Sequence, residues 1–508
     1  MNVTEPCSTG IGGDAFALFF NASTKNVEAL QSCGRSPGAL TLEAVLAHPD
    51  VGGRKELPPL SALCTTVPGA AAAWDAAVKR WGQKPLTEVL QPAVELAERG
   101  FPVAPGTARA WAVGADALLH AARGEATPFL PGGRAPAAGE IFRNPDLAQT
   151  FRCLGEAGAA AGFYRGRVAD AIVKALAERG GILSAEDLAA HKALNVEPIS
   201  TTFRGKLRLW ECPPPTQGVV ALMALNLLEN EHSHALLSAD ALHAQAEALR
   251  LAFADALQFC ADPSASDSPG VVALLNKGRA TARWARHFRQ AQRSTDVTSD
   301  SSMCEARPGS DTVYLCAADQ WGNACSFINS NYMGFGTGIV PRGCGFTLQN
   351  RGHNFILREG HPNCVGPRKF CYHTIIPGMA TRESDGELFA ALGVMGGFMQ
   401  PQGHLQVVCA MADHGLDPQA ALDLPRFCLD GVDSAVGPES AADARLLLEE
   451  GVPDDVMHEL ERRGHKCRRI SSWKREVFGR GQIIFRDPAS GVLAGGTEPR
   501  ADGAVLAW

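Results

Sequence analysis

The sequence predicts an α+β fold in which helices cover stacked β-sheets. Apolar residues recur at helical spacing through most of the chain before about residue 285, and strand-like segments separated by turns dominate after it. The chain of 508 residues is 45% hydrophobic and 20% charged, a globular composition with enough apolar residues for a large core. Helices packed outside stacked sheets give a layered architecture.

Helices are predicted where apolar residues lie on one face at helical spacing. In the segment 86–99, Leu86, Leu90 and Ala93 share such a face, and Gly100 then ends the helix. The same reasoning predicts further helices at 70–81, 145–154, 168–179, 239–259, 402–413 and 454–463.

Strands are sparse in the first half and frequent in the second. A hairpin is predicted where the strands 312–318 and 324–329 flank the turn 319–323, and a last hairpin joins 482–485 to 492–494. Single strands are expected at 16–21, 207–211, 345–348, 373–376 and 388–394.

Composition excludes several classes of function. The formal net charge is −7 and no basic stretch alternates with aromatic residues, so no nucleic-acid partner is expected. No apolar run reaches about 18 residues, so no membrane span is expected. The first ten residues lack the pattern of a signal peptide, and the 15 cysteines lack CxxC spacing. We therefore expect a cytoplasmic protein with buried thiols rather than a disulfide framework.

A polar, turn-rich stretch without periodicity covers residues 291–311, and we expect it to be a flexible loop. Loops of this kind tolerate cleavage of the chain. The chain would then divide into a region 1–311 and a region 312–508.

Two features could carry chemistry, and each also has an ordinary structural interpretation. Thr312 lies at a junction between loop and strand, where a β-branched residue commonly starts a strand. Gly396-Gly397 follows an apolar strand; such a pair is usually a tight turn, but its N–H groups can also bind an oxyanion. GxSxG, HExxH and GxxxxGK[ST] motifs are absent, and the histidines between 353 and 404 lack zinc-site spacing, so neither a metal nor a cofactor is expected.

Short glycine- and proline-rich segments follow one another in a characteristic order along the chain. They are 2–6, 9–13, 67–69, 96–103, 163–166, 213–218, 251–255, Asp319-x-x-Gly322-Asn323, 335–338, Gly396-Gly397 and 421–427. This ordered set resembles the gamma-glutamyltransferase (glutathione hydrolase) family of N-terminal nucleophile hydrolases. The segments 311–314, 349–352, 373–377 and 395–404 resemble its divergent branch of oxamate amidohydrolases and acylase-like members.

The resemblance implies the four-layer αββα fold of that class and a nucleophile at Thr312, seven residues before Asp319. It also implies self-cleavage between Asp311 and Thr312 into two chains that stay associated. The new α-amino group of Thr312, with a reference pKa of about 8, would serve as the base. The family's second hydroxyl corresponds to Ser330, and its oxyanion-binding N–H groups correspond to Gly396 and Gly397.

The substrate pocket departs from family members that act on glutathione. The positions that hold the glutamyl group in those members correspond here to Cys33 (with Arg35 nearby), Arg351, Asn354, His373 and Thr374. A positive charge at Arg351 disfavours an ammonium group and favours a carboxylate. We therefore expect a small acidic amide, hydrolysed or used as an acyl donor. The other interpretation is that Arg351 forms a structural ion pair.

Two alternatives to this function stay open. One is a true glutathione hydrolase or gamma-glutamyl transpeptidase whose pocket uses Arg35. The other is an uncleaved, non-catalytic relative that binds a partner. The family carries a further strand and helix before the segment that matches Asn2, so an N-terminal segment is expected to be missing here. The set of Thr312, Ser330 and Gly396-Gly397 favours an enzyme.

Overall fold

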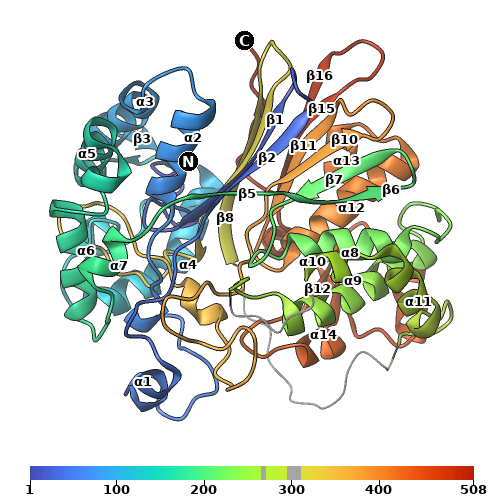
Figure 1. Cartoon of the computed structure of the whole chain (residues 1–508), viewed down its shortest axis with the longest axis horizontal. Helices are drawn as coiled ribbons and strands as arrows, with labels where there is room; N and C mark the ends of the chain where they lie inside the picture. The colour runs from blue at the N-terminus through green and yellow to red at the C-terminus, as the bar shows by residue number, and fades with distance from the viewer. Residues whose placement is uncertain (265–269, 295–309) are drawn as a thin grey trace.

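Two antiparallel sheets stacked face to face form the centre of the molecule (Figure 1). The computed structural model describes residues 1–264, 270–294 and 310–508. The first sheet has the order β5 (Leu194–Val196), β2 (Asn26–Ser32), β1 (Asp14–Asn21), β9 (Ala324–Met333) and β8 (Ser310–Ala318). The second has the order β16 (Leu493–Thr497), β15 (Arg480–Arg486), β11 (Leu388–Met395), β10 (Gly378–Arg382), β7 (Leu207–Glu211) and β6 (Ile199–Phe203).

Helices cover the outer face of each sheet. On the first sheet, α2 (Ala70–Trp81) packs against β1 and β2, with α3 (Leu86–Arg99) and α5 (Pro145–Gly162) behind it. On the second sheet, α8 (Gly218–Leu228) and α12 (Met399–His414) pack against the strands, and α9 (Ala239–Phe259) lies outside them. The predicted four-layer αββα arrangement is therefore confirmed.

The remaining elements surround this core. The helices are α1 (Leu42–Ala47), α4 (Pro105–Ala122), α6 (Arg167–Ala177), α7 (Ala185–Ala189), α10 (Val271–Leu274), α11 (Lys277–His287), α13 (Pro418–Asp423), α14 (Glu439–Asp443) and α15 (Asp454–Arg462). Short 3₁₀ helices are η1 (Ala62–Cys64), η2 (Pro131–Gly133), η3 (Arg351–Asn354) and η4 (Ser472–Phe478). Two small sheets contain β3 (Phe101–Pro102) with β4 (Ile141–Phe142), and β12 (Phe427–Asp430), β13 (Arg445–Glu449) and β14 (Cys467–Ile470).

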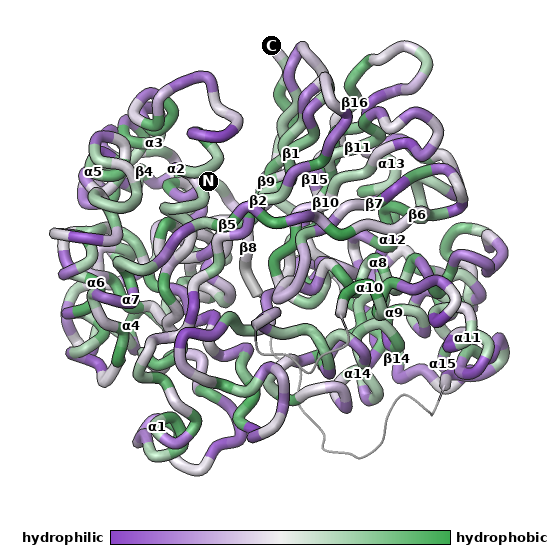
Figure 2. The backbone as a smooth tube through the Cα atoms, viewed as in Figure 1, coloured by the Kyte–Doolittle hydropathy of each residue, from purple (hydrophilic) through white to green (hydrophobic). Residues whose placement is uncertain are grey.

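The position of α8 follows from its composition. All of its residues are buried, including the single polar side chain Asn226, which bonds to Thr201 and to the Leu275 carbonyl. A helix that is apolar on every side must be enclosed by other elements. Figure 2 shows this hydrophobic segment between the second sheet and the outer helices.

Close contact between the two sheets depends on a glycine. A Cβ atom on Gly393 of β11 would lie 2.4 to 2.6 Å from atoms of the Tyr314 ring of β8. Ser326 of β9 also donates to the Leu392 carbonyl of β11 at 3.3 Å. These contacts hold β8, which contains Thr312, against β11, which leads into Gly396-Gly397.

Most predicted elements agree with the structure, and three helices, 70–81, 86–99 and 239–259, have the predicted bounds. Two predicted strands are wrong. Residues 345–348 bond to the loop 337–339 instead of a strand, since Thr337 N–H donates to the Leu348 carbonyl. In 373–376, the Ile376 N–H donates to the Gln400 side chain, and only His373 forms an isolated bridge.

The predicted loop 291–311 is corrected at its end. β8 begins at Ser310, so residues 310 and 311 are already in the strand. Residues 295–309 lie outside the described part of the chain. The regions 1–311 and 312–508 share both central sheets, because β1 pairs with β9 and β7 pairs with β10. They are therefore interleaved parts of one sandwich.

Within the described residues, no helix is long and apolar enough to cross a membrane.

Candidate active site

Thr312 lies at an irregularity in the first sheet. Asp311 pairs with Tyr332 and Val313 pairs with Asn329, so two residues of β9, Ser330 and Asn331, lie opposite the single residue Thr312. A β-bulge of this kind changes the direction of a side chain locally and is common beside active sites.

The bulge brings two hydroxyl groups together. Thr312 Oγ1 donates a hydrogen bond to Ser330 Oγ at 3.0 Å, and both side chains are fully buried. The Tyr332 N–H donates to the same Ser330 oxygen at 2.8 Å. Tyr332 has a φ of 79°, which is rare for an aromatic residue and is typical of strained backbone at a functional site. The predicted nucleophile and the predicted second hydroxyl are thus in direct contact.

Arg351 links this hydroxyl pair to a loop of the second half of the chain. One guanidinium nitrogen donates to Ser330 Oγ at 3.0 Å, and another donates to Thr374 Oγ1 at 2.7 Å. The guanidinium carbon lies 4.6 Å from the centroid of the Tyr332 ring, which is a cation–π distance. Three of the predicted site residues, Ser330, Arg351 and Thr374, therefore form one hydrogen-bonded row.

The Arg351 guanidinium is a fully buried cation with unused donor capacity. Among the side chains that the structure describes, no carboxylate lies within 4.0 Å of it, and its Nε has no acceptor. Burial lowers the pKa of Arg351, and the nearby carboxylate of Asp14 opposes that shift. The described residues thus offer Arg351 no direct ion pair.

Asp14 and His373 form a buried pair beside this row. The Ile375 N–H donates to His373 Nδ1 at 3.4 Å, so the proton is on Nε2, which donates to Asp14 Oδ2 at 3.0 Å. Asp14 is also the cross-strand partner of Ser330. His373 was among the residues predicted from the sequence and Asp14 was not, although an acidic residue at the start of a buried strand, directly after Gly12-Gly13, is a usable signal.

The Asp14 carboxylate is held by three donors on its other oxygen. The Gly34 and Gly69 N–H groups and Gln349 Nε2 lie 3.1, 2.9 and 3.0 Å from Asp14 Oδ1. Burial nevertheless raises the pKa of Asp14 to about 7, with Arg351 and these donors acting against it. Burial, together with the charge of Arg351, holds the pKa of His373 well below its ordinary value. The pair therefore changes its charge near neutral pH through Asp14.

The turn at Gly396-Gly397 is tied to the same row through Gln217. Gln217 Nε2 donates to the Thr374 carbonyl at 2.5 Å and to the Gly397 carbonyl at 2.8 Å. Hydrogen bonds thus run from Thr312 through Ser330, Arg351, Thr374 and Gln217 to Gly397. Gln217 lies in the segment 213–218 that the sequence analysis singled out, but no role was assigned to it there.

The turn itself is shaped for presenting N–H groups. Gly396 and Gly397 have φ values of 134° and 57°, which favour glycine. Their carbonyls accept the N–H groups of Met399 and Gln400 in the first turn of α12. In the described part of the chain, neither glycine N–H donates a hydrogen bond. Two unpaired N–H groups in such a turn can bind an anion.

Asn354 and Arg35 lie at the edges of this arrangement. Asn354 ends η3, which Arg351 begins; its Oδ1 accepts from Ser434, and its buried Nδ2 has no partner among the described residues. Arg35 makes its contacts elsewhere, with Asp262 at 2.8 Å and with the face of the Phe370 ring at 3.7 Å. The structure therefore does not bring Arg35 into the row.

Metal-binding spacing occurs twice among the described residues, in the groups His243, Glu247 and His465, and Glu56, His353 and Asp433. In the first group, Glu247 already accepts from Arg250 at 2.6 Å. In the second, His353 Nδ1 donates to the Leu57 carbonyl at 2.6 Å. Neither group contains Thr312, Ser330, Arg351 or Thr374.

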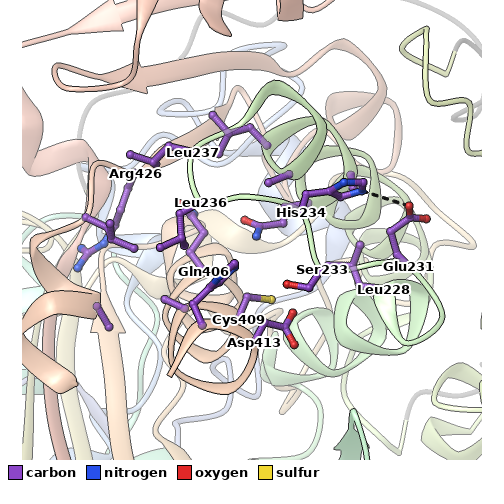
Figure 3. Close-up of a pocket in the computed structure, with 18 of the residues that line it drawn as sticks. Leu228, Glu231, Ser233, His234, Leu236, Leu237, Gln406, Cys409, Asp413 and Arg426 are labelled. Carbon is purple, nitrogen blue, oxygen red and sulfur yellow. Dashed lines mark hydrogen bonds and ion pairs between the residues drawn. The ribbon is translucent and has the colours of Figure 1, made fainter. Parts of the chain in front are cut away.

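A pocket away from Thr312 lies between α8, α9 and α12 (Figure 3). Its volume is about 70 Å³, and two pairs of its polar and charged side chains are in contact with each other. His234 lies 3.3 Å from Glu231, and Arg204 lies 3.2 Å from Asp413. It contains none of the predicted site residues.

Comparison with known proteins gives consistent findings. A family model described as Gamma-glutamyltranspeptidase matches residues 1–508. The chain is 34% identical to the glutathione hydrolase-like YwrD proenzyme of Bacillus subtilis (strain 168), covering 99% of this chain and 91% of the relative. It is 30% identical to the oxamate amidohydrolase proenzyme of Klebsiella pneumoniae, covering 100% and 92%. The crystal structure of cephalosporin acylase from Bacillus halodurans superposes with a TM-score of 0.86 at 43% identity, covering 100% and 89%.

Proposed function

Because this chain belongs to the gamma-glutamyltranspeptidase family, as its motifs predicted, we propose that it is a self-cleaving amidohydrolase with Thr312 as nucleophile. The observation that carries the proposal is the buried contact between Thr312 Oγ1 and Ser330 Oγ at 3.0 Å, at a bulge one residue after Asp311. The relatives named as proenzymes support a processing step.

The first step is cleavage of the chain. Thr312 Oγ1 attacks the carbonyl carbon of Asp311, the peptide nitrogen leaves, and an ester joins Asp311 to the threonine oxygen. Water hydrolyses this ester and leaves a carboxylate on Asp311 and a free α-amino group on Thr312. Ser330 accepts the threonine hydrogen bond and so orients the oxygen, while Arg351 and the Tyr332 N–H hold Ser330. Cleavage leaves the two chains associated, since they share both sheets.

The second step uses the new amino group. A threonine hydroxyl becomes an effective nucleophile only when a base accepts its proton, and an α-amino group titrates near neutral pH. The oxygen attacks the substrate amide, the amine half leaves with the proton, and an acyl-Thr312 ester remains. The Gly396 and Gly397 N–H groups stabilise the negative oxygen of the tetrahedral intermediate. Water then releases an acid, or an amine takes the acyl group.

The charge of the site favours an acidic acyl group. Arg351 is fully buried, has an unpaired Nε and no carboxylate within 4.0 Å among the described side chains. A buried guanidinium with free donors binds a carboxylate strongly and repels an ammonium group. We infer a small amide whose acyl half carries a carboxylate. The alternative of a glutathione hydrolase that uses Arg35 is disfavoured, because Arg35 is engaged with Asp262 and Phe370.

Intact-mass analysis of the purified protein tests this proposal. We expect two fragments, the smaller beginning at Thr312, and a single uncut chain for Thr312→Ala. Thr312→Ser is the matched control, because it keeps the hydroxyl and should still cleave, although more slowly. A wild-type chain that stays uncut, or a Thr312→Ala chain cut at the same bond, would refute the proposal and favour the non-catalytic alternative.

A further inference from the structure

Gln217 joins the loop that contains Thr374 to the turn at Gly396-Gly397. It lies directly before α8 and is fully buried. Its Nε2 donates to the Thr374 carbonyl at 2.5 Å and to the Gly397 carbonyl at 2.8 Å, and its Oε1 accepts the Tyr372 hydroxyl at 3.3 Å. The reversed amide would place its oxygen against both carbonyls, so these partners fix the orientation of the side chain.

The backbone of Gln217 is anchored to the same loop. Its N–H donates to the His373 carbonyl at 2.9 Å, and the His373 N–H donates to the Pro215 carbonyl at 2.8 Å. These bonds lie on either side of the bridge between Thr216 and His373. Main chain and side chain together hold Gln217 in one place, as a rigid spacer between the loop and the turn requires.

Arg351 is the branch point of the hydrogen-bonded row. From one guanidinium nitrogen, the bonds pass through Ser330 Oγ to Thr312 Oγ1, and each is 3.0 Å long. From another, they pass through Thr374 and Gln217 to the glycine turn. The guanidinium is thus connected separately to the proposed nucleophile and to the proposed oxyanion turn.

The turn needs a tie of this kind because glycine has few conformational restraints. Gly396 and Gly397 have positive φ values, and their carbonyls accept N–H groups from the first turn of α12. The Ile376 N–H donates to Gln400 Oε1 at 2.9 Å and so links the loop to α12 beyond the turn. Among the side chains that the structure describes, Gln217 is the one that donates to a carbonyl of the two glycines. It therefore ties the turn itself to the loop that Arg351 contacts.

In the proposed reaction, the acyl half of the substrate meets three points at once. Its carboxylate pairs with Arg351, its carbonyl carbon meets Thr312 Oγ1, and its carbonyl oxygen points to the turn. Two hydrogen bonds separate the guanidinium from Thr312 Oγ1, so the acyl half is short. A rigid spacer between the first and third points makes the length of the acyl chain critical, because a misplacement of about 1 Å can lower the rate about a hundredfold.

We propose that Gln217 is a specificity-determining positioning residue, which sets the number of carbons between the carboxylate and the reacting carbonyl of the substrate. Gln217 acts through Thr374 and Gly397, by holding Arg351 at a fixed distance from the oxyanion turn. The inference rests on the proposed function, since it takes the roles of Arg351 and the turn from there.

Hydrolysis of the mono-4-nitroanilides of malonic, succinic, glutaric and adipic acid tests this role, because the released 4-nitroaniline is measured by its absorbance. We expect wild type to prefer one chain length over its neighbours by about tenfold or more in kcat/KM. Gln217→Met, which has a similar size but no donor, should reduce this preference to about threefold or less.

Gln402→Met is the matched control. Gln402 is equally buried, and its amide donates to the Phe398 and Leu429 carbonyls at 2.9 and 3.3 Å. Its loss should leave the preference for chain length as in wild type, even where the activity falls for every substrate. A change of preference thus separates the spacer from a general loss of packing.

Protein checked by intact mass to be fully cleaved is compared. An unchanged preference in Gln217→Met, or a wild type without preference among the chain lengths, would overturn this inference and leave the proposed function intact. A cleaved wild type that hydrolyses none of these amides would instead refute the proposed acidic acyl half, and this inference with it. Gln217→Asn keeps the test valid if Gln217→Met fails to fold or to cleave, because its shorter amide reaches one carbonyl but does not join the two.

Discussion

The Arg351 guanidinium donates to Ser330 Oγ at 3.0 Å, and that oxygen also accepts the hydrogen bond of the Thr312 hydroxyl. A buried cation therefore lies one hydrogen-bonded residue away from the proposed nucleophile. This contact connects substrate charge, the orientation of the nucleophile and pH dependence, and each connection can be tested separately.

Ser330→Ala should slow self-cleavage about a hundredfold, because Thr312 loses the acceptor that orients its hydroxyl. The half-life of the precursor on denaturing gels measures this effect. Ser326→Ala is the control: Ser326 is a buried serine of the same strand, but it contacts Tyr314 and the Leu392 carbonyl. Equal cleavage rates in wild type and Ser330→Ala would contradict the role of Ser330.

Arg351→Gln should reduce kcat/KM for amides with an acidic acyl half by about a hundredfold, and should leave amides with an uncharged acyl half much less affected. Arg351→Glu should shift the preference toward acyl halves that carry an ammonium group. Cleavage must be measured first, so that only fully processed protein is compared. An unchanged preference in Arg351→Glu would show that Arg351 does not contact the substrate.

Asp14→Asn should remove a step near pH 7 in the dependence of the kinetic constants on pH. The pKa of Asp14 is raised to about 7, so lowering the pH through 7 protonates it and removes the negative charge that offsets Arg351. We therefore expect the wild-type KM for an amide with an acidic acyl half to fall as the pH drops through 7, because the unopposed charge of Arg351 binds the carboxylate more tightly. In Asp14→Asn this KM should be low and should not change near pH 7. A wild-type step that persists near pH 7 in the variant would exclude Asp14 as its source.

The same group predicts an effect of pH on stability. The pKa of Asp14 is higher in the folded chain than in the unfolded chain, where it is about 3.9, so the folded chain binds the proton more tightly. This contribution to the free energy of unfolding is present below pH 4 and is lost as the pH rises to about 7. Urea unfolding of Thr312→Ala between pH 4 and 8 should therefore show a downward slope that adding Asp14→Asn removes. An unchanged slope would argue against the raised pKa.

Gly393→Ala should destabilise the sandwich by roughly 1–3 kcal/mol, since the new methyl group would meet the Tyr314 ring between the two sheets. Thermal unfolding of the Thr312→Ala background measures the loss without interference from cleavage. Gly366→Ala is the control, because a Cβ atom there would meet only the Lys369 side chain at 3.8 Å. Equal midpoints for the two variants would mean that the sheets separate readily at this point.

Local patterns predicted much of the fold. Apolar residues at helical spacing followed by a glycine predicted the helices 70–81 and 86–99. Two strand-like segments around one turn predicted the hairpin 312–329. The errors at 345–348 and 373–376 have a common cause. Both stretches are buried like strands, but their backbone groups bond to the loop 337–339 and to the Gln400 side chain instead of to a neighbouring strand, and no local pattern shows this.

The sequence by itself determined the layered α+β class and the family, and it indicated Thr312 as the candidate nucleophile. Periodicity and the order of short motifs can be recognised in the chain without knowing which residues meet in space. Only the tertiary structure decided which side chains meet. His373 reaches Asp14 across 359 positions, and Arg351 reaches Ser330 rather than an acidic partner. Such contacts arise when distant strands and loops pack against one another, and burial then raises the pKa of Asp14 and leaves Arg351 without a carboxylate within 4.0 Å among the described side chains.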